Sequence, residues 1–333
     1  MHRLAFEKIE EILFDILKNH DFSEKRARLI AKTHTQSSCD GVYSHGLNRF
    51  PLFMDYVERG WIDVTAEPER VGSFGALERW DGKLAPGVSN AHHCTERAIE
   101  LAREHTLGCV ALRNTNHWMR GGTYGWQAAE EGKIALCFTN TKPNMPPWGG
   151  RENRIGNNPF VIAIPRKKGH VVLDMATSQF SFGKINTYKL KNESLPFAGG
   201  WDKEGNLTKN PEKILATGQA VPAGYWKGSA LTIVLDMLAA LLSAGKPTHE
   251  IDDNKEVSIC QVFICIDPEK FSNRDLKDQL LDDIISYVHD VPARKQGDRT
   301  FYPGEQTLAT RNDHLENGIP VSESVWEAIM GLS

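Results

Sequence analysis

The sequence predicts an α/β protein whose sheet is antiparallel or mixed rather than doubly wound. Apolar residues recur at helical spacing near both ends of the chain, whereas the middle carries short, β-rich segments bounded by Gly, Pro or Asn. Three of these segments, residues 134–139, 160–164 and 171–175, follow one another with no helical stretch between them. Parallel strands need a crossover, usually a helix, so this succession favours antiparallel pairing.

The first 105 residues are predicted to be largely helical. Apolar residues recur at helical spacing from Leu4 to Leu17, which predicts an opening amphipathic helix. A second helix is expected over residues 22–38, with Asp21 and Glu24 as its capping box.

Two further helices are expected before the sheet. The first begins within residues 43–49 and ends at Gly60, and the second is capped by Ser89 and ends at His105. Short strands and a loop are expected between them.

The remaining elements follow from local composition. Strands are expected at residues 109–113, 134–139, 160–164, 171–175 and 259–266. Helices are expected at residues 125–131, 230–242, 274–288, 306–316 and 322–330. Residues 195–218 are polar and rich in turn signals, which predicts a long surface loop.

Composition narrows the class of protein. A chain of 333 residues favours two domains. The balance of 39 basic and 43 acidic residues excludes the strong basic footprint of a protein that binds nucleic acid or an anionic membrane. The six cysteines form no C-x-x-C pair, and the first residues do not resemble a signal peptide. The longest apolar stretch is too short to span a bilayer. Together these features predict a cytoplasmic protein.

The segment Tyr43–Arg49 carries the first candidate chemistry. A helix starting here would place His45 at its positive end, with Arg49 four residues on along the same face. An imidazole that releases a proton near neutral pH, beside a guanidinium that grips a carboxylate, suits reduction of a 2-keto acid. The alternative is a histidine bonded to backbone beside a solvated arginine.

A second cluster surrounds His117. It lies just past a predicted strand, among two asparagines, two arginines, a tryptophan and Gly121-Gly122. Strand ends are where α/β sheets place ligands, although a packed aromatic turn is an equal alternative. The loop Thr139–Gly150 follows another strand, and its prolines suit a rigid wall of a binding site.

Gly224–Ser229 provides a third candidate. Lys227, beside the free N–H groups of a helix start, would suit a phosphate or pyrophosphate, and Trp226 offers a stacking face. Ordinary capping by Ser229 is the alternative. No metal site is expected, since His92-His93-Cys94 point in different directions on a helix. No G-x-G occurs, so no Rossmann fingerprint is present.

Several motifs in order resemble the malate/L-lactate dehydrogenase type 2 family of NAD(P)-dependent oxidoreductases. They are Tyr43–Arg49, Asn116–Gly122 with Tyr124-Gly125-Trp126, Met145–Gly150, Arg154–Pro159, Gly224–Ser229 and Pro303-Gly304-Glu305. The resemblance implies a nicotinamide cofactor bound without a Rossmann fold, on a mostly antiparallel sheet. It also implies a homodimer with the active site near the subunit interface. We therefore expect a helical domain from residues 1–75 with about 305–333, and a sheet-containing cofactor and substrate domain from about 76–304.

The resemblance also implies roles for individual residues. His45 corresponds to the proton donor, with Ser44 and Arg49 beside it, and His117 to a second acid/base histidine. The expected substrate-binding residues are Ser44, Arg49, Asn116, Met145 and Trp148. The expected cofactor-binding residues are His170, Val171, Val172, Leu173, Asp174, Met175, Ala176, Trp226, Lys227, Gly304, Glu305 and Gln306.

Pro146-Pro147, where many relatives have Ala-Pro, resembles the form of a branch of the family that acts on sugar-derived 2-keto acids. The resemblance also implies NADH as the cofactor. Malate-, lactate- and ureidoglycolate-type dehydrogenases remain alternatives within the family. A non-catalytic sugar-acid binding protein is the alternative outside it. NADP also remains possible, because the basic turn Arg166-Lys167-Lys168 precedes the cofactor strand and could hold a 2′-phosphate.

Overall fold

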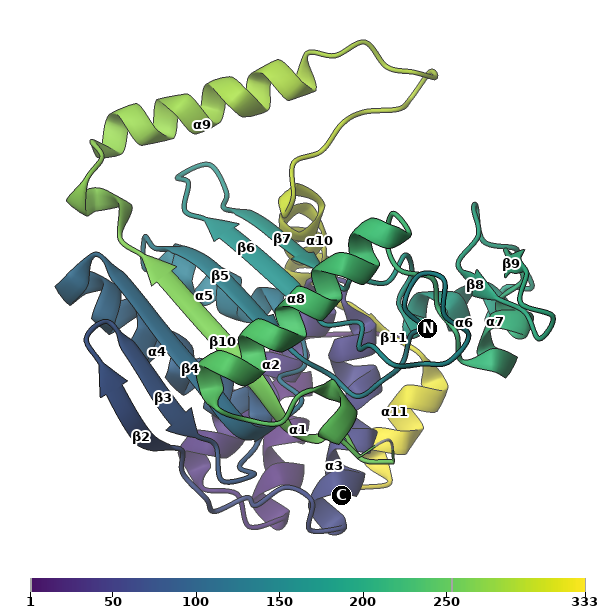
Figure 1. The fold of residues 1–333 in the computed structure, drawn as a ribbon, viewed down its shortest axis with the longest axis horizontal. Helices are drawn as coiled ribbons and strands as arrows, with labels where there is room; N and C mark the ends of the chain where they lie inside the picture. Colours follow the sequence, from purple (N-terminus) through teal and green to yellow (C-terminus); the bar gives the residue numbers. More distant parts are fainter. Residues whose placement is uncertain (1, 253, 333) are drawn as a thin grey trace.

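A seven-stranded sheet forms the centre of the molecule (Figure 1). The computed structural model describes residues 2–252 and 254–332, with all side chains except those of 274 and 275. In spatial order the strands are β2 (Glu69–Phe74), β3 (Leu77–Asp81), β4 (Leu107–Asn116), β10 (Val257–Ile266), β5 (Ile134–Thr139), β6 (Phe160–Ile164) and β7 (Val171–Met175). The bounds predicted for β5, β6 and β7 are confirmed.

The prediction of a mostly antiparallel, mixed sheet is also confirmed. Only the β3–β4 pair among the named strands of this sheet is parallel. β10 lies between β4 and β5 and pairs antiparallel with both, so that Val262 faces Ala111 on one side and Phe138 on the other. The strand that completes the sheet therefore comes from much later in the chain than its neighbours.

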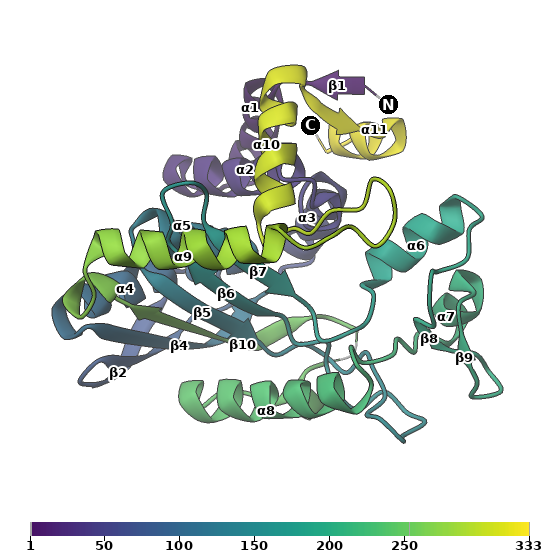
Figure 2. The same ribbon diagram turned by 90° about the horizontal axis from the view of Figure 1, so that it is seen from above.

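Helices cover both faces of this sheet, because alternate strand residues point to opposite sides. Val110 and Leu112 of β4 pack against α4 (Gly87–His105) and α5 (Gly122–Glu130). Cys109 and Ala111 belong instead to a cluster with α8 (Trp226–Ser243). Figure 2 shows α8 alone below the sheet and most other helices above it.

The two ends of the chain build one helical unit. β1 (His2–Leu4) pairs antiparallel with β11 (Ile319–Val321), which the sequence did not predict. Four helices of this unit share one buried core; they are α1 (Phe6–Asn19), α2 (Glu24–Cys39), α3 (Phe50–Glu58) and α11 (Glu323–Met330). A fifth helix, α10 (Glu305–Asn317), packs against α2 and β11. They lie together on one side of the sheet (Figure 2).

Two predicted helix starts are wrong by a few residues. α2 is capped by Ser23, whose Oγ accepts a hydrogen bond from the Arg26 N–H, while Asp21 has a positive φ of 62°. α4 begins at Gly87, and the hydroxyl of Ser89 donates to the Pro86 carbonyl instead of capping. In both cases several nearby polar residues were possible caps, and only the chain path selects among them.

The segment Tyr43–Arg49 is not the first turn of an α-helix, which corrects the sequence prediction. It forms two 3₁₀ turns, Tyr43–His45 and Leu47–Arg49, and α3 begins at Phe50. Gly46 joins them where a Cβ would lie 2.2 Å from Ser38 Oγ. This close approach to α2 bends the chain, so His45 does not sit at the positive end of a helix.

Residues 195–218 are structured, contrary to the predicted loop. They contain the short strands β8 (Gly200–Trp201) and β9 (Leu207–Thr208), and α7 (Pro211–Thr217), which Asn210 caps. Leu195 and Ile214 anchor this unit against α6 (Phe182–Leu190), another helix that the sequence did not reveal. The apolar anchors are too sparse for a periodic pattern to show.

α8 begins four residues earlier than predicted, at Trp226, so Ser229 does not cap it. It is the one helix among the described residues that is long and apolar enough to cross a membrane. However, Leu235 and Ala239 pack on the sheet, and Asp236 accepts hydrogen bonds from Asn140 and Thr248. These contacts identify α8 as a packed helix of the globular fold.

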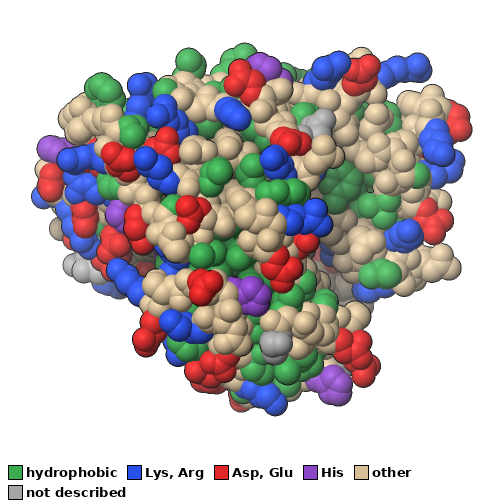
Figure 3. Space-filling view, turned by 90° about the horizontal axis from the view of Figure 1, so that it is seen from below, with side chains coloured by type: hydrophobic (Ala, Val, Ile, Leu, Met, Phe, Trp, Pro, Cys, Tyr) green, Lys and Arg blue, Asp and Glu red, His purple; other side chains and the backbone are tan. Residues whose placement is uncertain are grey.

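α9 (Arg274–His289) projects along the outside of the sheet layer and leads into an extended segment before α10 (Figure 1). Two further 3₁₀ turns, Thr248–Glu250 and Pro268–Lys270, flank β10 in sequence. All six cysteines are free and buried. On the face in Figure 3, acidic and basic side chains are interspersed, in keeping with the near balance of charge in the sequence.

Candidate active site

A cavity of about 890 Å³ lies where the helical unit meets the β7 edge of the sheet. The 3₁₀ turns, the segment after β4, the loop after β5, β7, the start of α6, Glu256 and residues 301–307 all contribute to its lining. It therefore gathers side chains from both ends and the middle of the chain.

The cavity brings together ten of the residues predicted from the sequence. They are Ser44, His45, Arg49, His117, Val172, Leu173, Asp174, Ala176, Gly304 and Gln306. The other predicted residues do not line it; they are Asn116, Met145, Trp148, His170, Val171, Met175, Trp226, Lys227 and Glu305.

Five of the nine residues outside the cavity fall into two groups. Asn116 donates to the Leu84 and Ala85 carbonyls, and Met145 is fully buried, so both belong to the framework. Trp148 lies on the surface, with its ring 4.9 Å from that of Tyr225, the residue before Trp226. Trp148, Trp226 and Lys227 thus share a surface region apart from the cavity.

Two histidines stack in the cavity. The rings of His45 and His117 are 5.6 Å apart and inclined by 20°. The backbone N–H of Met119 donates to His117 Nδ1 over 3.0 Å, so the neutral ring carries its proton on Nε2. Ser44 Oγ is hydrogen-bonded to His45 Nδ1 at 3.0 Å. Both rings are thus oriented by contacts from their own loops.

Burial favours the neutral form of both rings. Desolvation lowers the pKa of His117 well below its usual value, and the Arg49 charge lowers it further. Desolvation also lowers the pKa of His45, and Arg49 and Arg120 act in the same direction, while Asp174 opposes them. A proton placed on either ring is therefore readily given up.

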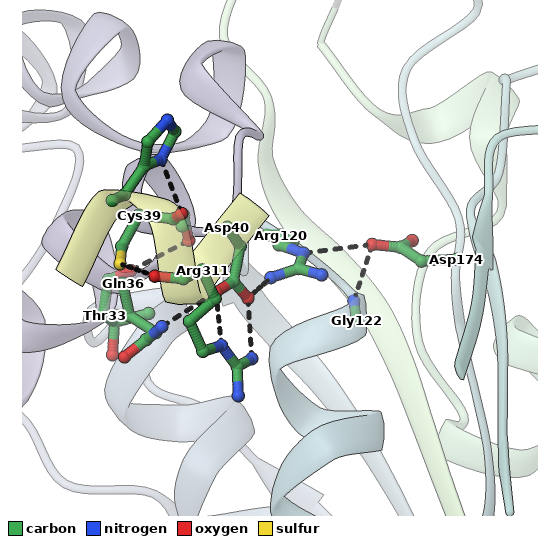
Figure 4. A network of polar contacts seen from close by, with 10 residues as sticks. Thr33, Gln36, Cys39, Asp40, Arg120, Gly122, Asp174 and Arg311 are labelled. Atoms are coloured by element: carbon green, nitrogen blue, oxygen red, sulfur yellow. Dashed lines mark hydrogen bonds and ion pairs between the residues drawn. The ribbon is translucent and has the colours of Figure 1, made fainter. Parts of the chain in front are cut away.

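Arg120 lines the cavity and is held in a buried ion-pair network (Figure 4). Asp40, at the end of α2, is paired with Arg120 and accepts two hydrogen bonds from Arg311 of α10, at 2.7 and 2.9 Å. Burial alone would raise the pKa of Asp40, but the Arg311 hydrogen bonds and the Arg120 charge lower it. The network joins the helical unit to the sheet.

Asp174 is the second member of this network that lines the cavity. It accepts a hydrogen bond from the Gly122 N–H at 2.8 Å, and Arg120 Nε lies 3.7 Å from the same oxygen (Figure 4). The sequence revealed Arg120 only as part of a motif and assigned no role to Asp40 or Arg311. These residues are 80 to 271 positions apart, a separation that no local pattern reports.

Arg49 has a carboxylate partner that the sequence did not indicate. Its Nη2 lies 3.5 Å from Oε2 of Glu256, the residue before β10, and both line the cavity. Lys142 and Asn144, from the loop after β5, line it as well. No sequence pattern marked Glu256 as a site residue, because it lies in a short polar run that is typical of a surface turn.

The edge of β7 fits a nicotinamide group. An edge strand presents N–H and C=O groups to its surroundings, and here Val172 donates to the Pro303 carbonyl at 2.8 Å. Gly304 has a φ of +98°, and a Cβ there would lie 3.1 Å from the His170 carbonyl oxygen. Val172, Leu173 and Pro303 line the cavity beside this contact and form a largely apolar cradle into which a nicotinamide ring could fit.

His92 and His93 do not form a metal site. The His92 ring packs against Tyr124, and its Nε2 lies 3.3 Å from Thr33 Oγ1, while His93 packs against Trp80. Within residues 2–252 and 254–332, no group of three or more His, Cys, Asp or Glu side chains is arranged to hold a metal ion.

Comparison with known proteins agrees with this architecture. The family model described as malate/L-lactate dehydrogenase matches residues 4–330. A 2,3-diketo-L-gulonate reductase of Citrobacter koseri is 42% identical over 332 residues, covering 99% of this chain and 100% of the relative. An Escherichia coli protein of the same name is equally similar.

Solved structures share the fold. The sulfolactate dehydrogenase of Methanocaldococcus jannaschii superposes with a TM-score of 0.92 at 27% identity, covering 99% of this chain and 96% of the other. The malate dehydrogenase of Pyrococcus horikoshii gives 0.91 at 26% identity, covering 99% and 94%. These dehydrogenases therefore share their fold with a chain that lacks the glycine fingerprint. The chain belongs to the malate/L-lactate dehydrogenase family and is an oxidoreductase that interconverts keto and hydroxy groups, which implies a nicotinamide cofactor.

Proposed function

We propose that the protein reduces a sugar-derived 2-keto acid with NADH, and that 2,3-diketo-L-gulonate, reduced to 3-dehydro-L-gulonate, is the substrate. The observation that carries this proposal is the stacked pair of His45 and His117 beside Arg49 in one cavity. The name of the 42% identical relatives supports the choice of substrate. Malate-, lactate- and ureidoglycolate-type substrates are the alternatives within the family.

The cofactor would lie along β7 and the Pro303-Gly304 turn, where the cradle is. When bound, it supplies the hydride. Val172, Leu173 and Pro303 would hold its ring against the edge of the sheet and exclude water, and Gln306 lies at the same wall. Gly304 permits the close approach that shapes this wall.

The side chains of the 3₁₀ turns and the segment after β4 would act on the substrate. Arg49 binds the carboxylate, and His117 donates a hydrogen bond from Nε2 to the keto oxygen. Negative charge grows on that oxygen as the hydride arrives, and His45 delivers the proton that neutralises it. Ser44 orients His45 through its Nδ1.

The surroundings of Arg166-Lys167-Lys168 support NADH rather than NADPH. Arg166 and Lys168 are paired with Asp282 of α9 at 2.6 and 2.7 Å, and Lys167 with Asp278 at 3.3 Å. These carboxylates already offset the positive charge that a 2′-phosphate would need. We expect kcat/KM to be higher with NADH. An NADPH preference that disappears when Arg166, Lys167 and Lys168 are neutralised would overturn this choice.

We also propose a cytoplasmic homodimer. The outer side of α8 exposes Val234, Met237 and Leu241, which are 50%, 58% and 72% exposed. An apolar stripe of this kind is a typical contact surface. Sedimentation at equilibrium would measure the mass, and a monomer at micromolar concentration would contradict the proposal.

One experiment tests the function directly. The purified protein is titrated with NADH and followed by nicotinamide fluorescence, then offered 2,3-diketo-L-gulonate, pyruvate and oxaloacetate in parallel. We expect saturable NADH binding and the highest kcat/KM with the diketo acid. A non-catalytic sugar-acid binding protein would bind the acid without NADH, and a preference for pyruvate or oxaloacetate would move the protein to another branch of the family.

A further inference from the structure

Glu256 is a buried carboxylate in the candidate active site that the proposed mechanism does not use. It stands immediately before β10, whose first residue, Val257, pairs with Asn116 next to His117. Its side chain is only 11% exposed, yet it lines the cavity and faces the Arg49 guanidinium at 3.5 Å. An ionised carboxylate at this depth needs compensation.

The positive charges near Glu256 compensate only partly for the burial of its carboxylate. Desolvation raises the pKa of Glu256, and the charges of Arg49 and Lys142 offset only part of that effect. The Arg49 contact is one long N···O approach rather than the two parallel hydrogen bonds that a guanidinium can form with a carboxylate. The Asp40–Arg311 pair, with two short bonds, shows what a saturated pair in this protein looks like.

Arg49 is also the group proposed to bind the substrate carboxylate. Two carboxylates would then share one guanidinium, and one of them, Glu256, has a side chain that is only 11% exposed. Like charges at such a distance cannot both remain ionised without a large cost, so one of them takes up a proton. A 2-keto acid is a far stronger acid than a glutamate, so the proton goes to Glu256.

We propose that Glu256 is a positioning residue that holds Arg49 in the free enzyme and releases it to the substrate carboxylate, taking up one proton from solvent as it does so. This inference rests on the proposed function, because it takes the ligand of Arg49 to be a 2-keto acid. No covalent bond changes in this step; the proton moves from solvent to a Glu256 oxygen.

The consequence is a binding affinity that depends on pH. Once Glu256 is ionised in the free enzyme, each further unit of pH weakens substrate binding by up to about tenfold. The charged groups facing Glu256 are Arg49 and Lys142, and the neutral rings of His45 and His117 line the same cavity. Protonation of those rings at lower pH would act in the same direction, so a variant must separate the contributions.

The variant is Glu256→Gln, which keeps an oxygen for Arg49 but carries no charge. The probe is oxamate, an unreactive analogue of a 2-keto acid, titrated calorimetrically into the protein saturated with NADH. Measurement at one pH in two buffers of different ionisation enthalpy gives the number of protons taken up. Glu250→Gln, on the same connection but exposed, is the matched control.

We expect the wild-type protein and Glu250→Gln to take up a proton on binding oxamate, approaching one per site as the pH rises. Glu256→Gln should take up almost none and bind oxamate about three- to tenfold more tightly at pH 8, because the competing charge is absent. The pH dependence of the KM should flatten in that variant, while saturation with NADH stays the same.

Two outcomes would overturn this inference and leave the proposed function intact. One is unchanged proton uptake in Glu256→Gln, and the other is weaker oxamate binding by that variant at every pH. If Glu256→Gln does not fold, wild-type affinity for oxamate that stays constant between pH 6 and 9 also overturns it. A wild-type protein that reduces no 2-keto acid and does not bind NADH would refute the proposed function itself, which the fluorescence titration detects separately.

Discussion

Two arginine–carboxylate pairings belong to the candidate active site, and they differ in how completely their hydrogen-bonding groups are satisfied. Asp40 is buried between Arg120 and Arg311, with paired charges and short hydrogen bonds. Arg49 and Glu256 approach through a single contact of 3.5 Å inside the cavity. In the Asp40 pairs the hydrogen-bonding groups are largely occupied, so these pairs stabilise the fold. In the Arg49–Glu256 pair, hydrogen-bonding groups remain available to a ligand.

The largest expected effect belongs to the cavity side. His45→Gln removes the proton donor and should lower kcat by about 10²- to 10⁴-fold with little change in NADH affinity or in the free energy of unfolding. Steady-state kinetics and NADH fluorescence measure this. If His117→Gln abolishes turnover while His45→Gln keeps it, the two histidines exchange roles.

The next prediction breaks the saturated pair. Asp40→Asn takes the carboxylate away from the buried Arg120 and from the largely buried Arg311, and should lower the free energy of unfolding by roughly 3–5 kcal/mol. Urea denaturation measures the loss. The matched control is Asp313→Asn, which breaks the exposed Arg3–Asp313 pair and should cost under about 1 kcal/mol. Equal effects of the two changes would remove the distinction between the networks.

Arg49→Lys breaks the unsaturated pair without removing the charge. An ammonium cannot form the two parallel hydrogen bonds of a guanidinium, so kcat/KM should fall about 10- to 100-fold, since one charge-assisted hydrogen bond is worth roughly 1.5–3 kcal/mol. Stability should hardly change. Kinetics with a keto acid at several concentrations provide the test, and normal KM and kcat would place Arg49 outside the substrate site.

The last prediction concerns the pH dependence of turnover at saturating substrate. Burial holds the pKa of His45 below its ordinary value of 6.5. Reduction needs the protonated ring, so kcat for reduction should decline as pH rises through that lowered pKa, and kcat for oxidation should rise. A reduction rate that increases with pH between 5 and 7 would exclude His45 as the donor. By contrast, the pH dependence of substrate binding should report the protonation state of Glu256.

Local patterns predicted the parts of the molecule that depend on nearby residues. The bounds of β5, β6 and β7 could be read from short β-rich runs, because each is bounded by turn residues. The gathering of His45, Arg49 and His117 in one cavity was also anticipated, although as a hypothesis based on residue type and family resemblance. The chemistry of a side chain is visible in the sequence even where its partners are not.

What the sequence did not show depends on distant contacts. The pairing of Asp40 with Arg311 joins residues 271 positions apart, and Glu256 faces Arg49 across 207. The 3₁₀ turns at Tyr43–Arg49 arise from the close packing of Gly46 against Ser38, which no periodicity reveals. The surface location of Trp226 and Lys227 likewise follows from where α8 starts and how it packs.

The late position of β10 in the chain has a consequence for synthesis. Its residues, 257–266, occupy the middle of the sheet between β4 and β5, which leave the ribosome more than a hundred residues earlier. Until β10 arrives, those two strands expose unpaired apolar edges of the kind that template aggregation. The high sequence separation of the central contacts also slows folding. We therefore expect a nascent chain of this protein to expose these edges until β10, which ends at Ile266 of 333 residues, has been synthesised.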